Sequence, residues 1–218
     1  MKQIITVDIE TYSPQDITKV GAYRYAQDPD FQILLLGYVN ENSDTPRVLD
    51  LTSWPDTKHF LREQLPWLLD ACYTKRAHNA AFEWWCLSEA MGLSWEQRIE
   101  WLQQWECSMV HALYCGLPAQ LGALGAALKQ PEDGKPTQRN GGRTRNLPLH
   151  DPAQGRLFCK YNGMDVIAER ANDRKLAPWP VPESIMQQWR EDVEMNARGV
   201  AVDMELVEGA LACSALIT

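Results

Sequence analysis

A segment near the N-terminus in which apolar and polar residues alternate constrains the fold of this chain more than any other feature. Ile5, Val7 and Ile9 occupy every second position of the segment. Asp8 and Glu10 belong to the opposite set. Because successive side chains of a β-strand point to opposite faces of a sheet, the pattern predicts a strand with one buried face and one face that carries carboxylates.

Further apolar and periodic segments extend this strand into a complete domain. Strands are expected at residues 3–10, 32–40, 47–51, 73–78 and 105–108, the first three as a meander. Helices are expected at residues 57–69, with Asp56 as N-cap, and at 79–91, 109–114, 120–128, 153–176 and 183–198. Strands come first and helices alternate with them later, so we expect an α/β fold with a mixed five-stranded sheet flanked by helices.

Three prolines divide the chain near its C-terminal end. Pro178, Pro180 and Pro182 predict a linker, and Gly199 is expected to end the helix that follows it. We therefore expect one domain over residues 1–178 and a linker with a helical C-terminal extension over residues 179–218. A further helix starts near Asp203 and ends without a cap, as expected of a fragment or a truncated product.

The composition describes a chain that buries an ordinary core but has no basic coat. Of its 218 residues, 45% are hydrophobic and 23% are charged, which excludes global disorder. The formal net charge is −8 and the pI is about 5.0, which excludes a broadly basic nucleic-acid surface. Six cysteines without a CxxC pair and four histidines without ligand spacing argue against a zinc site or a disulfide framework.

The sequence also bears on the compartment. No apolar run approaches the ~20 residues that span a bilayer. Asp8 and Glu10 stand where a signal peptide would have its small-residue cleavage site. We therefore expect a cytoplasmic protein that has no membrane partner.

The first acidic motif is the pair on the opening strand. Asp8 and Glu10 are two residues apart, so their side chains leave the same face. Neighbouring carboxylates raise each other's pKa unless a cation lies between them, and hard oxygen ligands of this kind suit Mg²⁺ or Mn²⁺. The alternative is a solvated strand end with two unrelated acids.

The second motif lies in residues 77–87, at a strand-to-helix corner. Asn79 and Glu83 form an i,i+4 pair on one helix face, beside the face of Phe82. A structural explanation also suffices here, because Asn can cap a helix and the helix dipole favours Glu in the first turn.

The third motif lies in residues 158–166. Tyr161 and Asp165 are one helical turn apart, so the phenol and the carboxylate emerge together. Gly163 lowers helix stability by about 1 kcal/mol relative to Ala, which is understandable if another group approaches the backbone closely or if the cost is tolerated. An ordinary amphipathic face is the alternative.

Taken in order, the three motifs resemble those of the 3′–5′ exonuclease domain of family A DNA polymerases, particularly the polymerases of bacteriophages and prophages. That domain belongs to the DEDD exonuclease superfamily and has a ribonuclease H-like fold. The resemblance covers nearly the whole chain and rests on Asp8-Ile9-Glu10-Thr11, His78-Asn79 to Phe82-Glu83, and Tyr161 with Asp165. The superfamily divides according to whether a Tyr four residues before the last Asp, or a His five residues before it, handles the attacking water. This chain has Tyr161 and carries Lys, not His, at position 160, so it is similar to the tyrosine subtype.

The resemblance implies a metal-dependent exonuclease that removes nucleotides from DNA 3′ ends during proofreading, with two Mg²⁺ ions for which Mn²⁺ can substitute. Asp8 would bridge both ions, Glu10 and Asp165 would complete one site, and Glu83 would hold the other. Tyr161 would orient the attacking water. The partners implied are a single-stranded DNA 3′ end, contacted by Thr11, Asn79 and Phe82, and a polymerase domain in cis or in trans.

One position departs from the family pattern. The second motif usually carries Asp where this chain has Glu83. We expect this carboxylate to reach its metal largely through water, which would absorb the additional methylene. Otherwise the second metal would bind weakly and activity would be low.

A basic stretch lies between the second and third motifs. Residues 129–146 contain five Lys or Arg against two acids, a local charge of +3. We expect Arg139, Arg143 and Arg145 to track the backbone of the substrate strand. The alternative is an ordinary solvated loop.

Two other functions stay open at this point. An RNA-trimming 3′–5′ exonuclease of the same superfamily would use the same two-metal chemistry. A degenerate domain that serves only as a scaffold belongs to a different class. All four expected metal positions are acidic, which argues for activity. The sequence contains no polymerase active site, and it leaves the oligomeric state undetermined.

Overall fold

The computed structural model of the chain describes residues 3–130 and 152–215. Its centre is one mixed sheet with the strand order β3-β2-β1-β4-β5. The strands are β1 (Gln3–Tyr12), β2 (Gln32–Asn40), β3 (Arg47–Asp50), β4 (Tyr73–Ala77) and β5 (Trp105–Cys107). The predicted mixed five-stranded sheet with flanking helices is confirmed.

Strand β1 is the middle strand of the sheet. It pairs antiparallel with β2 and parallel with β4. β2 pairs antiparallel with β3, as the predicted meander requires, and β4 pairs parallel with β5. The register between β1 and β2 places Asp8 opposite Gly37 and shifts between Glu10 and Thr11, where the strand has an irregularity.

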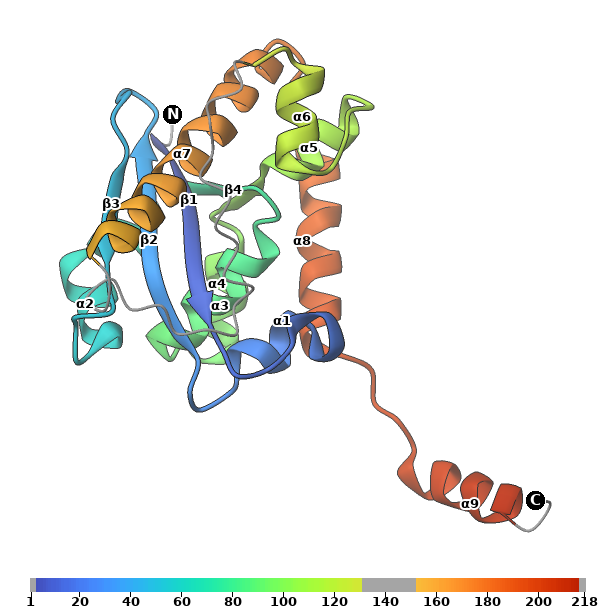
Figure 1. Cartoon of the computed structure of the whole chain (residues 1–218). Helices are drawn as coiled ribbons and strands as arrows, with labels where there is room; N and C mark the ends of the chain where they lie inside the picture. Colours follow the sequence, from blue (N-terminus) through green and yellow to red (C-terminus); the bar gives the residue numbers. More distant parts are fainter. Residues whose placement is uncertain (1–2, 131–151, 216–218) are drawn as a thin grey trace.

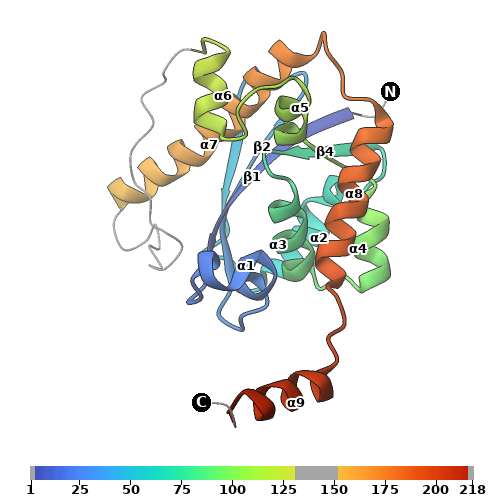
Figure 2. The ribbon, with the colours of Figure 1, turned by 90° about the vertical axis from the view of Figure 1, so that its right-hand side faces the viewer.

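The helices cover both faces of the sheet. They are α1 (Ile17–Ala26), α2 (Thr57–Gln64), α3 (Ala81–Met91), α4 (Trp95–Leu102), α5 (Ser108–Tyr114), α6 (Leu121–Ala127), α7 (Pro152–Leu176), α8 (Glu183–Arg198) and α9 (Met204–Ala215). Helix α7 crosses one face, and α2, α3 and α4 lie on the other (Figures 1 and 2). A short 3₁₀ helix, Pro66–Leu68, follows α2.

The alternation in β1 separates the core from the carboxylates, as predicted. Ile5, Val7 and Ile9 are buried in the main core with side chains of α2, α3 and α4. The opposite face of β1 meets α7. Four of the tryptophans pack inside the protein rather than on its surface: Trp84, Trp85, Trp101 and Trp105.

The helical predictions need three corrections. Helix α1 was not predicted, because Gly21 interrupts it with a φ of 74° and breaks the helical period. Helix α4 was also missed, although Ser94 and Gln97 form a capping box at its start. Helix α2 ends at Gln64 rather than at residue 69, because Pro66 disfavours helical backbone at Leu65 and supplies no N–H.

The two C-terminal helices differ in their packing. Val193 of α8 lies in the main core, and Arg190 Nε donates to the backbone oxygen of Trp105 at 3.2 Å. Helix α9 has no buried residue and lies away from the sheet (Figure 1). The division of the chain near residue 178 stays a prediction. Within the described ranges, no helix is both long and apolar enough to cross a membrane.

His111 joins α5 to the end of α7 and to the segment after it. Its Nδ1 lies 3.1 Å from Asp173 Oδ1, and its Nε2 lies 2.9 Å from the backbone oxygen of Trp179. Both neighbouring atoms are acceptors, so the protonated ring can donate to both. The hydrogen bond to Asp173 raises the pKa of His111 above its ordinary value of 6.5.

A raised pKa in the folded state predicts pH-dependent stability. The contribution of His111 should be fully present below about pH 6.5 and should disappear as the pH rises through the folded pKa. Thermal melting between pH 5.5 and 9 should therefore show that His111→Asn destabilises most at the acidic end. His59 is exposed, so His59→Asn is the control. An equal loss for His111→Asn at every pH would contradict the prediction.

Candidate metal centre

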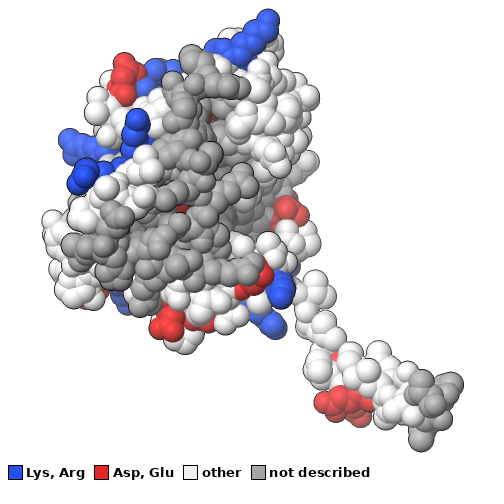
Figure 3. All heavy atoms as spheres, in the orientation of Figure 1, with Lys and Arg blue, Asp and Glu red and all other residues white. Residues whose placement is uncertain are grey.

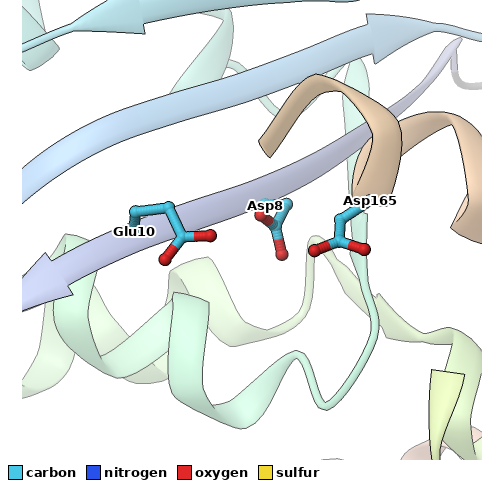
Figure 4. Close-up of side chains that lie close together, drawn as sticks. All are labelled: Asp8, Glu10 and Asp165. Carbon is cyan, nitrogen blue, oxygen red and sulfur yellow. The ribbon is translucent and has the colours of Figure 1, made fainter. Parts of the chain in front are cut away.

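Three carboxylates converge between β1 and α7. One oxygen each of Asp8, Glu10 and Asp165 lie within 4.8 Å of one another. Asp8 and Glu10 extend from β1, and Asp165 reaches them from α7, which passes beside the strand (Figure 4). The structure thus brings the first and third sequence motifs together at one point.

The cluster is electrostatically unfavourable without a cation. Asp165 is buried, while Asp8 and Glu10 are half-buried. Burial is the main factor that raises the pKa of Asp8 well above its usual range, and the charges of Glu10, Glu83 and Asp165 raise it further. A divalent cation among the three oxygens would remove this repulsion. An all-oxygen donor set of this kind suits Mg²⁺ or Mn²⁺, so the residues fit the metal that the sequence predicts.

Glu83 lies outside the group of three oxygens but close to it electrostatically. It stands in the first turn of α3, where the helix dipole favours a carboxylate. Glu83 is only 5% exposed, and its Oε2 has no hydrogen-bond partner in the described part of the chain. Burial, followed by the charges of Glu169 and Glu10, raises the pKa of Glu83 well above its usual range.

Tyr161 accompanies Asp165 on α7, as the spacing predicts. The two side chains share a hydrogen bond. Burial raises the pKa of Tyr161 above its ordinary value, and the nearby charge of Asp165 adds to the shift. The phenol therefore keeps its proton at neutral pH.

The corner between β4 and α3 differs from its expected form. Asn79 does not cap α3, because Ala80 is the N-cap residue and no side chain bonds to the helix start. Instead Asn79 has a left-handed backbone with a φ of 68°, a conformation that Asn tolerates better than most residues. The ring of the preceding His78 contacts Ser108 Oγ at 3.1 Å and the backbone oxygen of Ala119 at 2.6 Å.

Thr11 and Phe82 are linked through an aromatic residue of α1. Thr11 Oγ1 lies 3.0 Å from the hydroxyl of Tyr25, and the Tyr25 and Phe82 rings have centroids 6.3 Å apart. Phe82 is half-buried against the core. The predicted basic contacts lie outside the described residues: Arg139, Arg143 and Arg145.

Asn162 is a site residue that the motif analysis missed. Its Nδ2 donates to Asp8 Oδ2 at 2.6 Å and to the backbone oxygen of Asp8 at 3.3 Å. Asn162 is fully buried, and it approaches the sheet over Gly37. A Cβ at position 37 would lie 2.3 Å from Asn162 Oδ1. A sequence signal existed, since Asn162 lies between Tyr161 and Asp165, but the contact depends on where α7 crosses the sheet.

Fold and site together define an α/β protein in which carboxylates on the central strand and on a crossing helix form a candidate centre for divalent cations. No known protein-family model matches the chain. The chain is 36% identical over 224 residues to a DNA polymerase of Bacillus phage SP02. The alignment covers 96% of this chain and 33% of that protein. The chain thus spans about a third of the length of this relative, and it is related to one part of a phage DNA polymerase.

The close approach at Gly37 predicts a penalty for any side chain there. Gly37→Ala should destabilise the protein by about 1–3 kcal/mol, because the added methyl group displaces Asn162 and Val166 from the sheet. Chemical denaturation measures this loss. Gly122→Ala in α6 is the control, because no described atom lies within 4 Å of a Cβ there. Equal stability of the Gly37 variant and the wild type would refute the proposed steric restriction.

Proposed function

We propose that this chain is a metal-dependent 3′–5′ exonuclease that acts on DNA 3′ ends, built on a ribonuclease H-like fold. The observation that supports the proposal most strongly is the convergence of Asp8, Glu10 and Asp165 within 4.8 Å. Tyr161, hydrogen-bonded to Asp165, supplies a polar group beside these carboxylates. The similarity to a phage DNA polymerase agrees with this substrate and with proofreading.

The carboxylates act as cation ligands in this proposal. Asp8, Glu10, Glu83 and Asp165 would hold two Mg²⁺ ions, with Mn²⁺ as a substitute. Divalent ions at such a site lower the pKa of a bound water and stabilise charge on the leaving oxygen. Asn162 keeps Asp8 in position, because its amide donates a hydrogen bond to Asp8 Oδ2.

Tyr161 would position the attacking water rather than remove its proton. Its pKa is raised, so at neutral pH the phenol is a hydrogen-bond donor that is already engaged with Asp165. The phenol oxygen retains lone pairs that can accept a hydrogen bond from water. The side chain therefore suits an orienting role, and proton abstraction by a phenolate is disfavoured.

The terminal nucleotide would lie beside the second motif. Asn79 and Thr11 offer polar contacts, and Phe82 offers an aromatic edge near the same corner. Stacking of a base on an aromatic side chain contributes ~1–3 kcal/mol and tolerates every base. A site that removes any mismatched nucleotide needs such tolerance. A polymerase domain in cis or in trans would deliver the strand.

Removal of one ligand tests the proposal directly. Asp8→Ala should abolish Mg²⁺-dependent release of nucleotides from the 3′ end of labelled DNA and should leave the fold intact, because it also relieves repulsion among the carboxylates. Circular dichroism reports on the fold. Glu63→Ala, which changes an exposed acid of α2, should retain full activity. Undiminished cleavage by Asp8→Ala would overturn the assignment.

The choice between DNA and RNA needs a separate measurement. End-labelled DNA and RNA of equal sequence should be compared with Mg²⁺ and with a chelator. We expect faster shortening of DNA and complete inhibition by the chelator. Preferential shortening of RNA would favour the RNA-trimming alternative. Absence of both cleavage and cation binding would favour the scaffold alternative.

A further inference from the structure

Helix α7 carries a second buried acid on the face that bears Asp165. Glu169 follows Asp165 by one helical turn, so both side chains emerge on the same side. Only 2% of Glu169 is exposed. A carboxylate so deeply buried normally has partners for both oxygens, because an unpaired buried charge is costly.

The partners of Glu169 satisfy only part of its carboxylate. The Ser108 hydroxyl and the backbone N–H of His78 bond to this side chain. Among the residues that the structure describes, Oε1 nevertheless has no hydrogen-bond partner. The contacts fix the carboxylate against the β4–α3 corner and leave one oxygen available.

The neighbouring arginine does not satisfy this oxygen. Arg76 bonds through Nε and Nη2 to Glu106. Its Nη1 bonds to Asp173, one further turn along α7. Burial raises the pKa of Glu169 above its usual range, and the charge of Arg76 only partly opposes this shift. The hydrogen bonds of Arg76 go to these two other acids.

Glu83 carries a similar oxygen on a different helix, α3. Its Oε2 is also buried and has no hydrogen-bond partner within residues 3–130 and 152–215. Among charged groups, Glu169 contributes most to the raised pKa of Glu83. Both glutamates also raise the pKa of Asp8. Two unpartnered buried oxygens from different helices thus lie in mutual electrostatic range beside Asp8.

We propose that Glu169 is a further acidic ligand of the cation site and that it shares the second divalent cation with Glu83. The inference rests on the proposed function and extends its ligand set by one residue. The cation would be a hard ion such as Mg²⁺ or Mn²⁺, because the available donors are carboxylate oxygens. A second carboxylate would also strengthen cation binding at a site where the longer Glu83 replaces the usual Asp.

Calorimetric titration of the whole chain with Mn²⁺ tests the inference without reference to activity. The wild type should bind two ions. Glu169→Gln retains the size of the side chain but removes its capacity to carry a negative charge. The affinity of the site that Glu169 shares with Glu83 should therefore fall by about 10–100-fold. Glu83→Gln should weaken the same site. Asp173→Asn is the matched control, since it removes an acid one turn further along α7, and it should bind Mn²⁺ as the wild type does.

Melting curves separate ligand binding from a structural role. Without Mn²⁺, Glu169→Gln should melt at or above the wild-type temperature, because it replaces a buried acid whose ionisation beside other carboxylates is unfavourable. Mn²⁺ should then raise its melting temperature less than it raises that of the wild type. A variant that melts lower without metal but binds Mn²⁺ with wild-type affinity would overturn the inference.

The outcomes also distinguish this inference from the proposed function. Wild-type Mn²⁺ binding by Glu169→Gln, together with loss of binding by Asp8→Ala, would refute the role of Glu169 and leave the exonuclease proposal intact. A wild-type chain that binds no Mn²⁺ would refute both. Weakened binding by Asp173→Asn equal to that of Glu169→Gln would show a general charge effect and would refute the inference.

Discussion

The contact between α7 and the middle of β1 is the constraint on which the rest of the site depends. Asn162 of the helix bonds to Asp8 of the strand through both the carboxylate and the backbone oxygen. Together with the hydrogen bonds of Arg170 to Asn40 and Asp44, this contact aligns α7 over the sheet. Helical spacing then determines where Tyr161, Asp165 and Glu169 project. The buried amide of Asn162 therefore contributes to the placement of side chains along several turns of helix.

The two faces of helix α7 carry charges of opposite sign. Its inward face carries Asp165 and Glu169, which are buried, whereas Arg156, Lys160 and exposed residues near its end carry positive charge outward. Figure 3 shows acidic side chains on α9 and Lys and Arg side chains elsewhere on the same face of the protein. The net charge of −8 is thus the sum of regions that carry charge of opposite sign. A substrate would respond to the local field, which bound divalent ions would change substantially.

The sequence predicted regular elements well and tertiary contacts poorly. Alternation in β1 and the period of α8 are local patterns, so their positions followed directly. The kink at Gly21 and the stop at Pro66 modify helices through single residues, and they caused the errors at α1 and α2. The convergence of Asp8 with Asp165 was expected from the family resemblance. Glu169 and Asn162 escaped notice, because their roles arise only from the crossing of α7 over the sheet.

The steric fit between Gly37 and Asn162 has a consequence for the evolution of this site. The two residues are distant in sequence, yet a methyl group at one position requires a smaller or displaced side chain at the other. Position 37 therefore cannot gain a side chain without a change at position 162. A larger residue at 37 becomes acceptable only after 162 has shrunk, which in turn removes the amide that holds Asp8. Substitution at position 37, which has no chemical role of its own, is thereby restricted by the need to hold Asp8 on the neighbouring strand.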